Sequence, residues 1–359
     1  MKSTIYKYLS LMFLKKFFYV TLVFICLIFI LSLLEEINFF KNNNNNLITP
    51  LLSTALNTPS VLFEIFPFII LISTQFFFLN LIENKELNAL KINGISNIKI
   101  ILCLLLNTFV IGIILILFYY QFSSKLKFIY LDMKNSYSND NKYLAVVTNN
   151  GLWIKDEIDD KILIVNSKEI KNKFLIKNSI SEFDKNFRLN RVIESDKIDI
   201  GKKKWVILNP VVSNNNQTAK IDGNITINTH FDYFKINSLY RDLSSLNFFE
   251  INKLKEEFIF LGYSTKEIDS KLNSLYSYPI YLTLMTLITS ILMFRIQVNK
   301  PLIFHLIISI LLSVLIYYLT YLFRILGENE KLPLEVSSWL PLVVLFLFSS
   351  LGIVRINEK

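Results

Sequence analysis

Long apolar runs separated by polar stretches organise this chain. A helix needs about 20 mostly apolar residues to cross the hydrocarbon core of a bilayer. Six runs approach or reach that length and predict membrane-spanning helices: Phe17–Leu34, Val61–Ile82, Ile101–Phe122, Pro279–Ile296, Leu302–Leu326 and Trp339–Val354. From Ser123 to about His230 no run comes close to it. The pattern therefore predicts three spans, an inserted domain and three more spans.

The inserted segment is rich in short β-forming stretches. Seven are predicted as strands: Tyr143–Thr148, Gly151–Lys155, Lys161–Asn166, Phe174–Glu182, Phe187–Ile193, Lys204–Val212 and Lys220–Asn228. Asn149-Asn150-Gly151 is typical of a hairpin turn, and strands at this spacing favour a sandwich or a jelly roll. After them, Leu243 to Leu275 has helical spacing of apolar residues, with Gly262 as a break.

The predicted fold is an α-helical polytopic membrane protein. Its six transmembrane helices are arranged 3+3, with an inserted all-β jelly-roll-like domain. The predicted parts are residues 1–122 for the first three helices, 123–240 for the β domain, 241–278 for a helical connection and 279–359 for the last three helices. A polar helix at residues 83–96 lies within the first part.

A signal peptide is the competing interpretation of the N-terminus. The basic stretch Met1–Lys16 precedes an apolar run that is too long for the apolar core of such a peptide. No small-x-small cleavage site follows, and Glu35 and Glu36 stand there instead. We therefore expect the first run to be a membrane span.

Two features surround the second span. Leu47 to Ser60 is expected to include an amphipathic helix lying outside the membrane. The span itself contains Glu64 and Pro67 near its outer end. A carboxylate within a span indicates function by default, but at this depth Glu64 could simply reach the interface, and we favour that interpretation.

A short polar island, Glu83–Ile100, separates spans two and three. Residues 86–91 are mostly good helix formers, and the apolar side chains Leu87 and Leu90 share one helical face beside small Ala89. Gly94 is the residue type that ends helices in a left-handed conformation, and Ser96 stands where the next helix needs an N-cap. The island therefore predicts a surface helix at the membrane face, with a plain solvated loop as the alternative.

Charge indicates the topology. The chain of 359 residues is 52% hydrophobic and carries a net charge of +9. Cytoplasmic loops of membrane proteins are enriched in Lys and Arg, so this excess is first a topology signal and not a sign of nucleic-acid binding. If the N-terminus is cytoplasmic, the cytoplasmic segments carry Lys2, Lys7, Lys15, Lys16, Lys85, Lys91, Lys99, Arg295, Lys300, Arg355 and Lys359. The two short outer loops and their flanks carry only Lys41, Arg324 and Lys331. This asymmetry favours cytoplasmic termini and a β domain on the other side of the membrane.

The sequence lacks the motifs of a catalytic site. It contains no G-x-x-x-x-G-K-[ST] phosphate-binding loop, so any ATP is expected to be hydrolysed by another chain. The two histidines, His230 and His305, fall in no catalytic or metal-binding pattern, and neither cysteine has metal-site spacing. We expect no cofactor, no metal and no enzymatic activity.

Several motifs resemble one family. Glu86-Leu87-x-Ala89-Leu90 followed by Gly94-Ile95-Ser96 is similar to the coupling loop of the lipopolysaccharide-export permeases LptF and LptG. Further motifs similar to this family, and more to LptG than to LptF, are Gly151-Leu152-Trp153-Ile154-Lys155-Asp156, Leu34-Glu35-Glu36-Ile37, Leu332-Pro333 and Trp339-Leu340-Pro341. The chain departs from the family pattern at Asn38-Phe39, where basic residues are usual. It departs again at Phe294–Gln297, where the family has Gly-Pro-Leu-Arg.

The resemblance implies the permease subunit of an ABC transporter in the bacterial inner membrane. Such a permease extracts lipopolysaccharide and passes it to a periplasmic bridge toward the outer membrane. The implied partners are the homologous permease LptF, two copies of the ATPase LptB and an LptC-like single-span protein. The ATPase-coupling residues would be Glu86, Leu87, Ala89, Leu90, Gly94 and Ser96. Glu86 is expected to be exposed, unexplained by packing and paired with a site on the ATPase.

Two further sets are expected to meet lipid. Cations near the outer rim are candidates for its phosphates: Lys41, Lys125, Lys127, Lys134 and Arg324. The alternative for each is an interface anchor that extends its charged end to water. Leu152, Trp153 and Ile154 are candidates for a lipid path through the β domain, although we favour Trp153 as plain core. The resemblance also implies that spans one and five form the lateral opening for lipid.

Three alternatives remain open. The chain could be a membrane scaffold whose β domain binds a periplasmic partner without transport. It could be LptF and not LptG. It could also be a permease of the lipoprotein-sorting type, which has four spans, so a count of six would exclude it.

Overall fold

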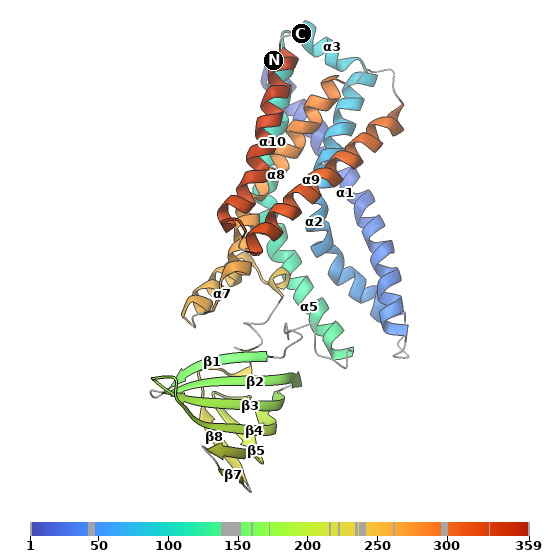
Figure 1. Cartoon of the computed structure of the whole chain (residues 1–359). Coiled ribbons are helices and arrows are strands. Elements are labelled where there is room, and N and C mark those ends of the chain that lie inside the picture. The colour runs from blue at the N-terminus through green and yellow to red at the C-terminus, as the bar shows by residue number, and fades with distance from the viewer. Residues whose placement is uncertain are drawn as a thin grey trace. The chain divides into compact units, whose positions relative to one another are not determined.

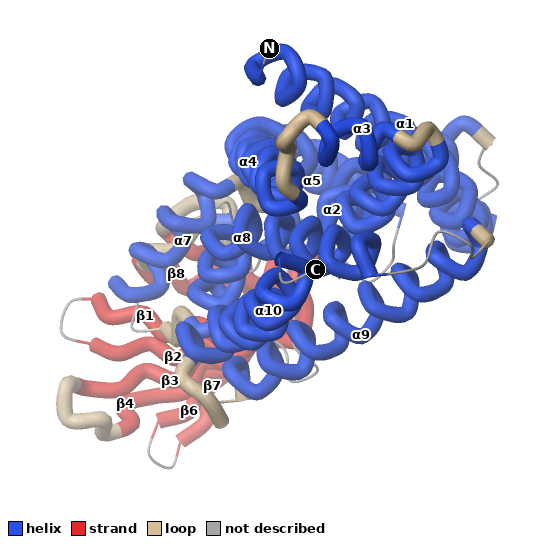
Figure 2. Tube along the Cα trace, turned by 90° about the horizontal axis from the view of Figure 1, so that it is seen from above, coloured by secondary structure: helices blue, strands red, loops and turns tan. Residues whose placement is uncertain are grey.

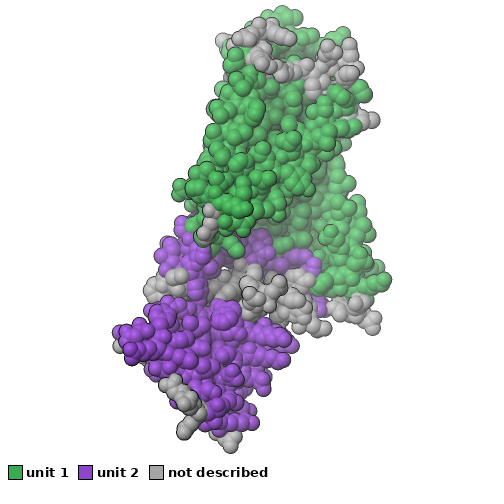
Figure 3. Space-filling model, in the orientation of Figure 1, with its two compact units in different colours: residues 1–127, 266–359 green, residues 128–265 purple. Residues whose placement is uncertain are grey.

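The computed structural model describes residues 2–41, 47–137, 152–158, 161–171, 173–214, 217–221, 223–233, 236, 242–260, 263–295, 301–329 and 331–357. The chain divides into two compact units (Figure 3). Unit 1 contains Met1–Lys127 and Lys266–Lys359, and unit 2 contains Phe128–Thr265. Unit 1 is helical, and unit 2 holds the β-strands.

Unit 1 is a helical bundle (Figure 1). Its elements are α1 (Lys2–Phe40), α2 (Ile48–Glu83), α3 (Glu86–Ile92), α4 (Asn97–Ile114), the π-helix η2 (Leu115–Tyr120), the start of α5 (Gln121–Tyr137), α8 (Lys266–Arg295), α9 (Leu302–Glu328) and α10 (Leu334–Asn357). Six helical segments of the described chain are long and apolar enough to cross a membrane, which confirms the predicted number of spans.

Burial separates central from peripheral helices. In the most apolar window of each helix, 72% of the residues of α2 and 67% of those of α8 are buried, against 17% in α1 and in α9. Figure 2 shows α9 along the edge of the bundle. Helices α1 and α9 therefore present most of their apolar surface outward, as a helix does when lipid or another protein covers it.

Three helices are longer than predicted. Helix α2 is continuous from Ile48 through Pro59 and Pro67 to Glu83, so the separate amphipathic helix predicted for Leu47–Ser60 is wrong. Helix α8 likewise begins at Lys266 and passes through Pro279. Membrane helices tolerate proline because neighbouring groups bind the freed carbonyls. The third span continues through η2 and α5 to Tyr137, because the sequence after Phe122 contains no Gly or Pro until well beyond that residue.

Unit 2 contains a curled antiparallel sheet followed by α7 (Phe248–Phe260). The strands are β1 (Leu152–Ile158), β2 (Lys161–Lys171), β3 (Phe174–Asp184), β4 (Leu189–Asp199), β5 (Lys204–Leu208), β6 (Val211–Asn214), β7 (Gln217–Lys220) and β8 (Asn224–Asn228). Their order is β1-β2-β3-β4-β5-β8, and β6 pairs with β4 and β7. The antiparallel β insertion between the helices confirms the predicted fold class. The strand predicted for Tyr143–Thr148, the turn at Asn149–Gly151 and Gly262 lie outside the described residues.

One predicted strand is two strands in the structure. Lys204–Val212 is interrupted between β5 and β6 at Asn209, which has a positive φ of 44°, and at Pro210. A left-handed backbone turns the chain away from the strand direction, and proline lacks the N–H that a ladder needs. Both short strands can then pair with the same edge of β4. Strand β5 pairs with the C-terminal end of β4, and β6 pairs with its middle.

Three buried polar side chains lie beside an irregularity in the strand pairing. Ser167, Asn178 and Ser195 lie opposite one another on β2, β3 and β4. Ser167 donates to the carbonyls of Glu169 and Ile176, and Asn178 donates to those of Leu175 and Ser195. Ser195 donates to the carbonyl of Leu208 at 2.6 Å. Lys177, next to Asn178, has a positive φ and leaves the pairing here, and these side chains bind backbone carbonyls around that irregularity.

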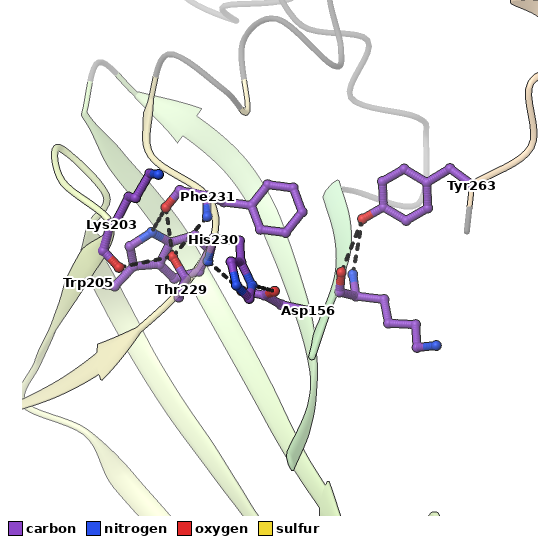
Figure 4. Close-up of polar contacts among 8 residues, drawn as sticks. Asp156, Lys203, Trp205, Thr229, His230, Phe231 and Tyr263 are labelled. Atoms are coloured by element: carbon purple, nitrogen blue, oxygen red, sulfur yellow. Dashed lines mark hydrogen bonds and ion pairs between the residues drawn. The ribbon is translucent and has the colours of Figure 1, made fainter. Parts of the chain in front are cut away.

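The two ends of the strand order meet through one carboxylate (Figure 4). Asp156 on β1 accepts hydrogen bonds from the backbone N–H of His230, at 2.9 Å, and lies 2.8 Å from its ring Nδ1. His230 follows β8, whose continuation is fixed by the indole N–H of Trp205 donating to the Phe231 carbonyl at 2.8 Å. The aspartate side chain is buried, so this contact closes the curled sheet at one corner.

Candidate functional site

A cavity of about 730 Å³ opens within unit 1. It is lined by α1, α2, α8, α9 and α10. The lining residues on α8 recur at helical spacing, as do those on α9. The α8 stripe contains Ser270, Ser274, Ser277 and Tyr281, and the α9 stripe contains Ser313, Tyr317, Thr320 and Arg324. Each helix therefore turns one polar stripe toward the cavity.

Two cations of the lining lie toward one end of the cavity. Lys271 lies near the start of α8, and Arg324 lies near the end of α9. The Ser270 hydroxyl donates to Glu328 at 3.2 Å, which shows that these two helix ends lie close together. Gly327 also lets α9 approach Ser337 of α10 so closely that a Cβ at position 327 would overlap the serine side chain.

The opposite part of the cavity is mainly apolar. It is lined by Phe68, Met285, Val314 and Leu342. Met285 lies farther along α8 from Lys271, and Val314 lies farther along α9 from Arg324. One end therefore offers cations, and the other offers mainly hydrocarbon. This polarity fits an amphiphile, with an anionic head at one end and acyl chains at the other.

Glu64 also lines the cavity. Its side chain is exposed at the cavity wall instead of being packed between helices. The sequence predicted that the Glu64 side chain reaches the membrane interface, and it did not predict that Glu64 lines a cavity. The cavity therefore combines two cations with one carboxylate.

Of the five cations predicted to meet phosphate, the structure places Arg324 at the cavity. Its guanidinium lies 3.9 Å from Glu328 and over the ring of Tyr321. Lys127 donates to Asn57 at 2.7 Å, and Lys134 donates to the hydroxyl of Tyr130 at 2.8 Å. The other two, Lys41 and Lys125, are exposed and do not line the cavity.

Sequence reasoning missed Lys271. The pattern that could have indicated it is the recurrence of Ser and Tyr on α8 at spacings of three and four residues. This spacing places polar groups on one face of an otherwise apolar helix. The predicted boundary at Pro279 hid this pattern, because it assigned Ser270 to Ser277 to a connection and Tyr281 to a span. The continuous helix joins them.

A second candidate site is the loop that holds α3. The N–H of Gly94 donates to the Lys91 carbonyl at 2.9 Å, and that of Ile95 donates to the Leu90 carbonyl at 3.0 Å. With a φ of 78° at Gly94, this is a Schellman C-cap, and it confirms the predicted glycine stop. Ser96 precedes α4 with an extended backbone, but its side chain makes no capping hydrogen bond.

The geometry corrects the expectation for Glu86. The hydroxyl of Tyr8 on α1 donates to both carboxylate oxygens of Glu86, at 2.9 and 3.1 Å. Glu86 is therefore half-buried and has an intramolecular partner. The remaining predicted coupling residues of α3, Leu87, Ala89 and Leu90, are partly or fully exposed, and none is buried.

The strand β1 corrects the expectation for Trp153. Leu152 and Ile154 are each 1% exposed, whereas Trp153 is 55% exposed. The favoured interpretation of Trp153 as plain core is wrong, because the two neighbours occupy the inner face and period-two alternation directs the indole outward.

Comparison with known proteins identifies the family. The model of the lipopolysaccharide export system permease LptF/LptG matches residues 7–355. No curated protein matches the chain. The family match and the six candidate spans of the described chain exclude the four-span lipoprotein-sorting type, and they indicate a multi-pass membrane permease that is not itself an enzyme. Because the match covers nearly the whole sequence, the chain belongs to the LptF/LptG family of lipopolysaccharide export permeases.

Proposed function

We propose that this chain is one permease half of an inner-membrane ABC transporter that extracts lipopolysaccharide and passes it toward the outer membrane. The observation that carries the proposal is the polarity of the cavity. Lys271 and Arg324 lie toward one end, and the other end is mainly apolar, so phosphates and acyl chains of one lipid would each meet a matching surface.

The size of the cavity supports a second permease subunit. A volume of about 730 Å³ lies in the range of pockets that hold drug-sized ligands. A lipid with several acyl chains needs more room, so a homologous permease, LptF if this chain is LptG, would supply the opposite wall. The motif Gly151–Asp156 supports the LptG assignment.

Coupling to ATP would run through α3. Two copies of an LptB-like ATPase would bind this helix, whose largely exposed surface includes Asn88, Ala89, Lys91 and Ile92. Glu86→Lys is expected to disrupt co-purification of the ATPase or coupled transport while the permease stays folded. If both survive the change, α3 is not the docking element.

The outward-facing helices support a lateral opening. We propose that α1 and the partner's counterpart of α9 form a gate through which lipid enters, and that an LptC-like single span inserts there. The low burial of α1 and α9 supports this proposal. A cysteine pair across that gate is expected to crosslink and stop export, and full export through a verified crosslink would remove the gate from this interface.

The β unit would continue the lipid path in the periplasm, with both termini of the chain in the cytoplasm. The inner face of β1, with Leu152 and Ile154, and the outer face, with Trp153, present two possible surfaces. A photo-crosslinker placed in turn at positions 152, 153 and 154 should capture lipid from one face only. Capture from neither face would leave β1 a structural strand.

The cavity cations provide the test of the proposed function. In proteoliposomes containing the permease pair and the ATPase, Arg324→Glu and Lys271→Glu should each lower ATP-dependent lipopolysaccharide release about tenfold or more, because each reverses a charge that meets phosphate. Lys266→Glu is the matched control, since Lys266 lies on α8 but does not line the cavity. Equal loss in all three variants would indicate a general charge effect and would contradict the cavity proposal.

A further inference from the structure

The start of α1 is joined to α3 by the hydrogen bond between Tyr8 and Glu86. One hydroxyl donates to both carboxylate oxygens, at 2.9 and 3.1 Å, across a separation of 78 residues. A hydrogen bond to a charged acceptor is about twice as strong as one between neutral groups. The pair therefore fixes the side chain of Glu86 toward α1 and away from its own helix.

Helix α3 has few other attachments. It buries none of its residues, and it packs mainly against α2. Lys85, which precedes it, has a left-handed backbone with a φ of 57° and provides no side-chain cap. Glu86 stands in the first turn, where a carboxylate could cap free N–H groups, yet its oxygens bind Tyr8 instead. A short helix with so little buried surface depends on such a contact for a fixed position.

We expect a displacement of α3 to move α1 in particular. Among the six candidate spans α1 is one of the two least buried, so it can shift with less repacking than α2 or α8. We propose that Tyr8 is a positioning residue that ties α3 to α1, so that displacement of α3 is transmitted to α1. This inference rests on the proposed role of α3 in coupling, and it adds the residue and the helix through which the displacement travels.

The first experiment measures the tether without transport. Hydrogen exchange of the α3 amides is followed in the full-length chain purified with its permease partner. Tyr8→Phe removes the donor alone and should speed exchange over residues 86–92 about three- to tenfold, the range expected from loss of one hydrogen bond. Tyr6→Phe is the control, because within the described residues the Tyr6 hydroxyl makes no hydrogen bond. Unchanged exchange in Tyr8→Phe would overturn the tether.

The second experiment measures transmission in the complete transporter. Tyr8→Phe should keep ATPase co-purification but lower the lipopolysaccharide released per ATP hydrolysed by about threefold or more, while Tyr6→Phe should leave the ratio unchanged. In a Glu86→Ala background, Tyr8→Phe should have no further effect, because its acceptor is gone. Faster exchange with an unchanged ratio would make Tyr8 merely structural and overturn the proposal. If α3 does not bind the ATPase at all, the Glu86→Lys result reveals it, while the exchange measurement still tests the contact itself.

Discussion

The hydroxyl of Tyr278 donates a 2.7 Å hydrogen bond to the backbone carbonyl of Phe63, and the two rings stack with their centroids 4.6 Å apart. In a regular helix the Phe63 carbonyl would accept from the N–H of residue 67, but Pro67 has none. A side chain of α8 therefore binds the carbonyl that a proline of α2 leaves open. Phe63 and Tyr278 both line the cavity, so this contact joins two of its walls.

We expect Tyr278→Phe to destabilise the bundle by about 1–3 kcal/mol, because the Phe63 carbonyl loses the donor that replaces the missing N–H of residue 67. Pro67→Ala restores an N–H at position 67. In that background Tyr278→Phe should cost much less, so the two substitutions should couple in a double-mutant cycle. Thermal unfolding in detergent measures all four proteins. Additive effects would show that the tyrosine does not replace the missing N–H.

The crossing of α4 and α8 gives a prediction in which two principles oppose each other. A Cβ at Gly112 would stand 2.7 Å from the backbone Cα of Pro279. Helix propensity alone predicts that Gly112→Ala stabilises α4 by about 1 kcal/mol. Because backbone cannot move aside as a side chain can, we expect the substitution to destabilise by about 1–3 kcal/mol instead. A higher unfolding temperature for Gly112→Ala would contradict this close approach.

The β unit contains a buried carboxylate that pairs with two partly exposed cations, and this pairing predicts a pH dependence. Glu182 on β3 accepts from Lys161 and from Arg191, each at 2.8 Å. Burial raises the pKa of this carboxyl, but the hydrogen bonds and charges of the two cations together outweigh it and hold the pKa below the ordinary 4.5. The ionised form is therefore more favourable in the folded chain. Its stabilisation is complete above the unfolded-state pKa and is lost as pH falls through the folded-state value.

Glu182→Gln should therefore lower the unfolding temperature of the β unit more at about pH 7 than at about pH 3. The fluorescence of buried Trp205 reports the transition, in a background where Trp153 and Trp339 are replaced by Phe. The same background with Glu182 intact is the control. An equal loss of stability at both pH values would show that ionisation of Glu182 does not contribute.

Local patterns predicted the local structure well. The end of α3 at Gly94 was predictable because a left-handed C-cap is a local feature that needs no partner elsewhere in the chain. The six candidate spans were predictable because they depend on the length of each apolar run. The residues of the candidate site were harder to predict from the sequence. Arg324 was expected to contact lipid phosphate, but Lys271 gains its position only when α8 passes through Pro279. The contact between Tyr8 and Glu86 joins residues 78 apart, and no periodicity reports such a pair.

The most direct measurement of the central claim is capture of lipid within the cavity. A photo-crosslinking amino acid at Tyr317, which lines the cavity, should form an adduct with lipopolysaccharide in the assembled transporter, and ATP turnover should reduce that adduct. The same amino acid at Phe348, an exposed residue of α10 that does not line the cavity, is the control. Strong capture at position 317 with little at position 348 is the predicted result. Equal capture at both positions, unaffected by ATP, would show contact with bulk lipid and contradict the proposed binding cavity.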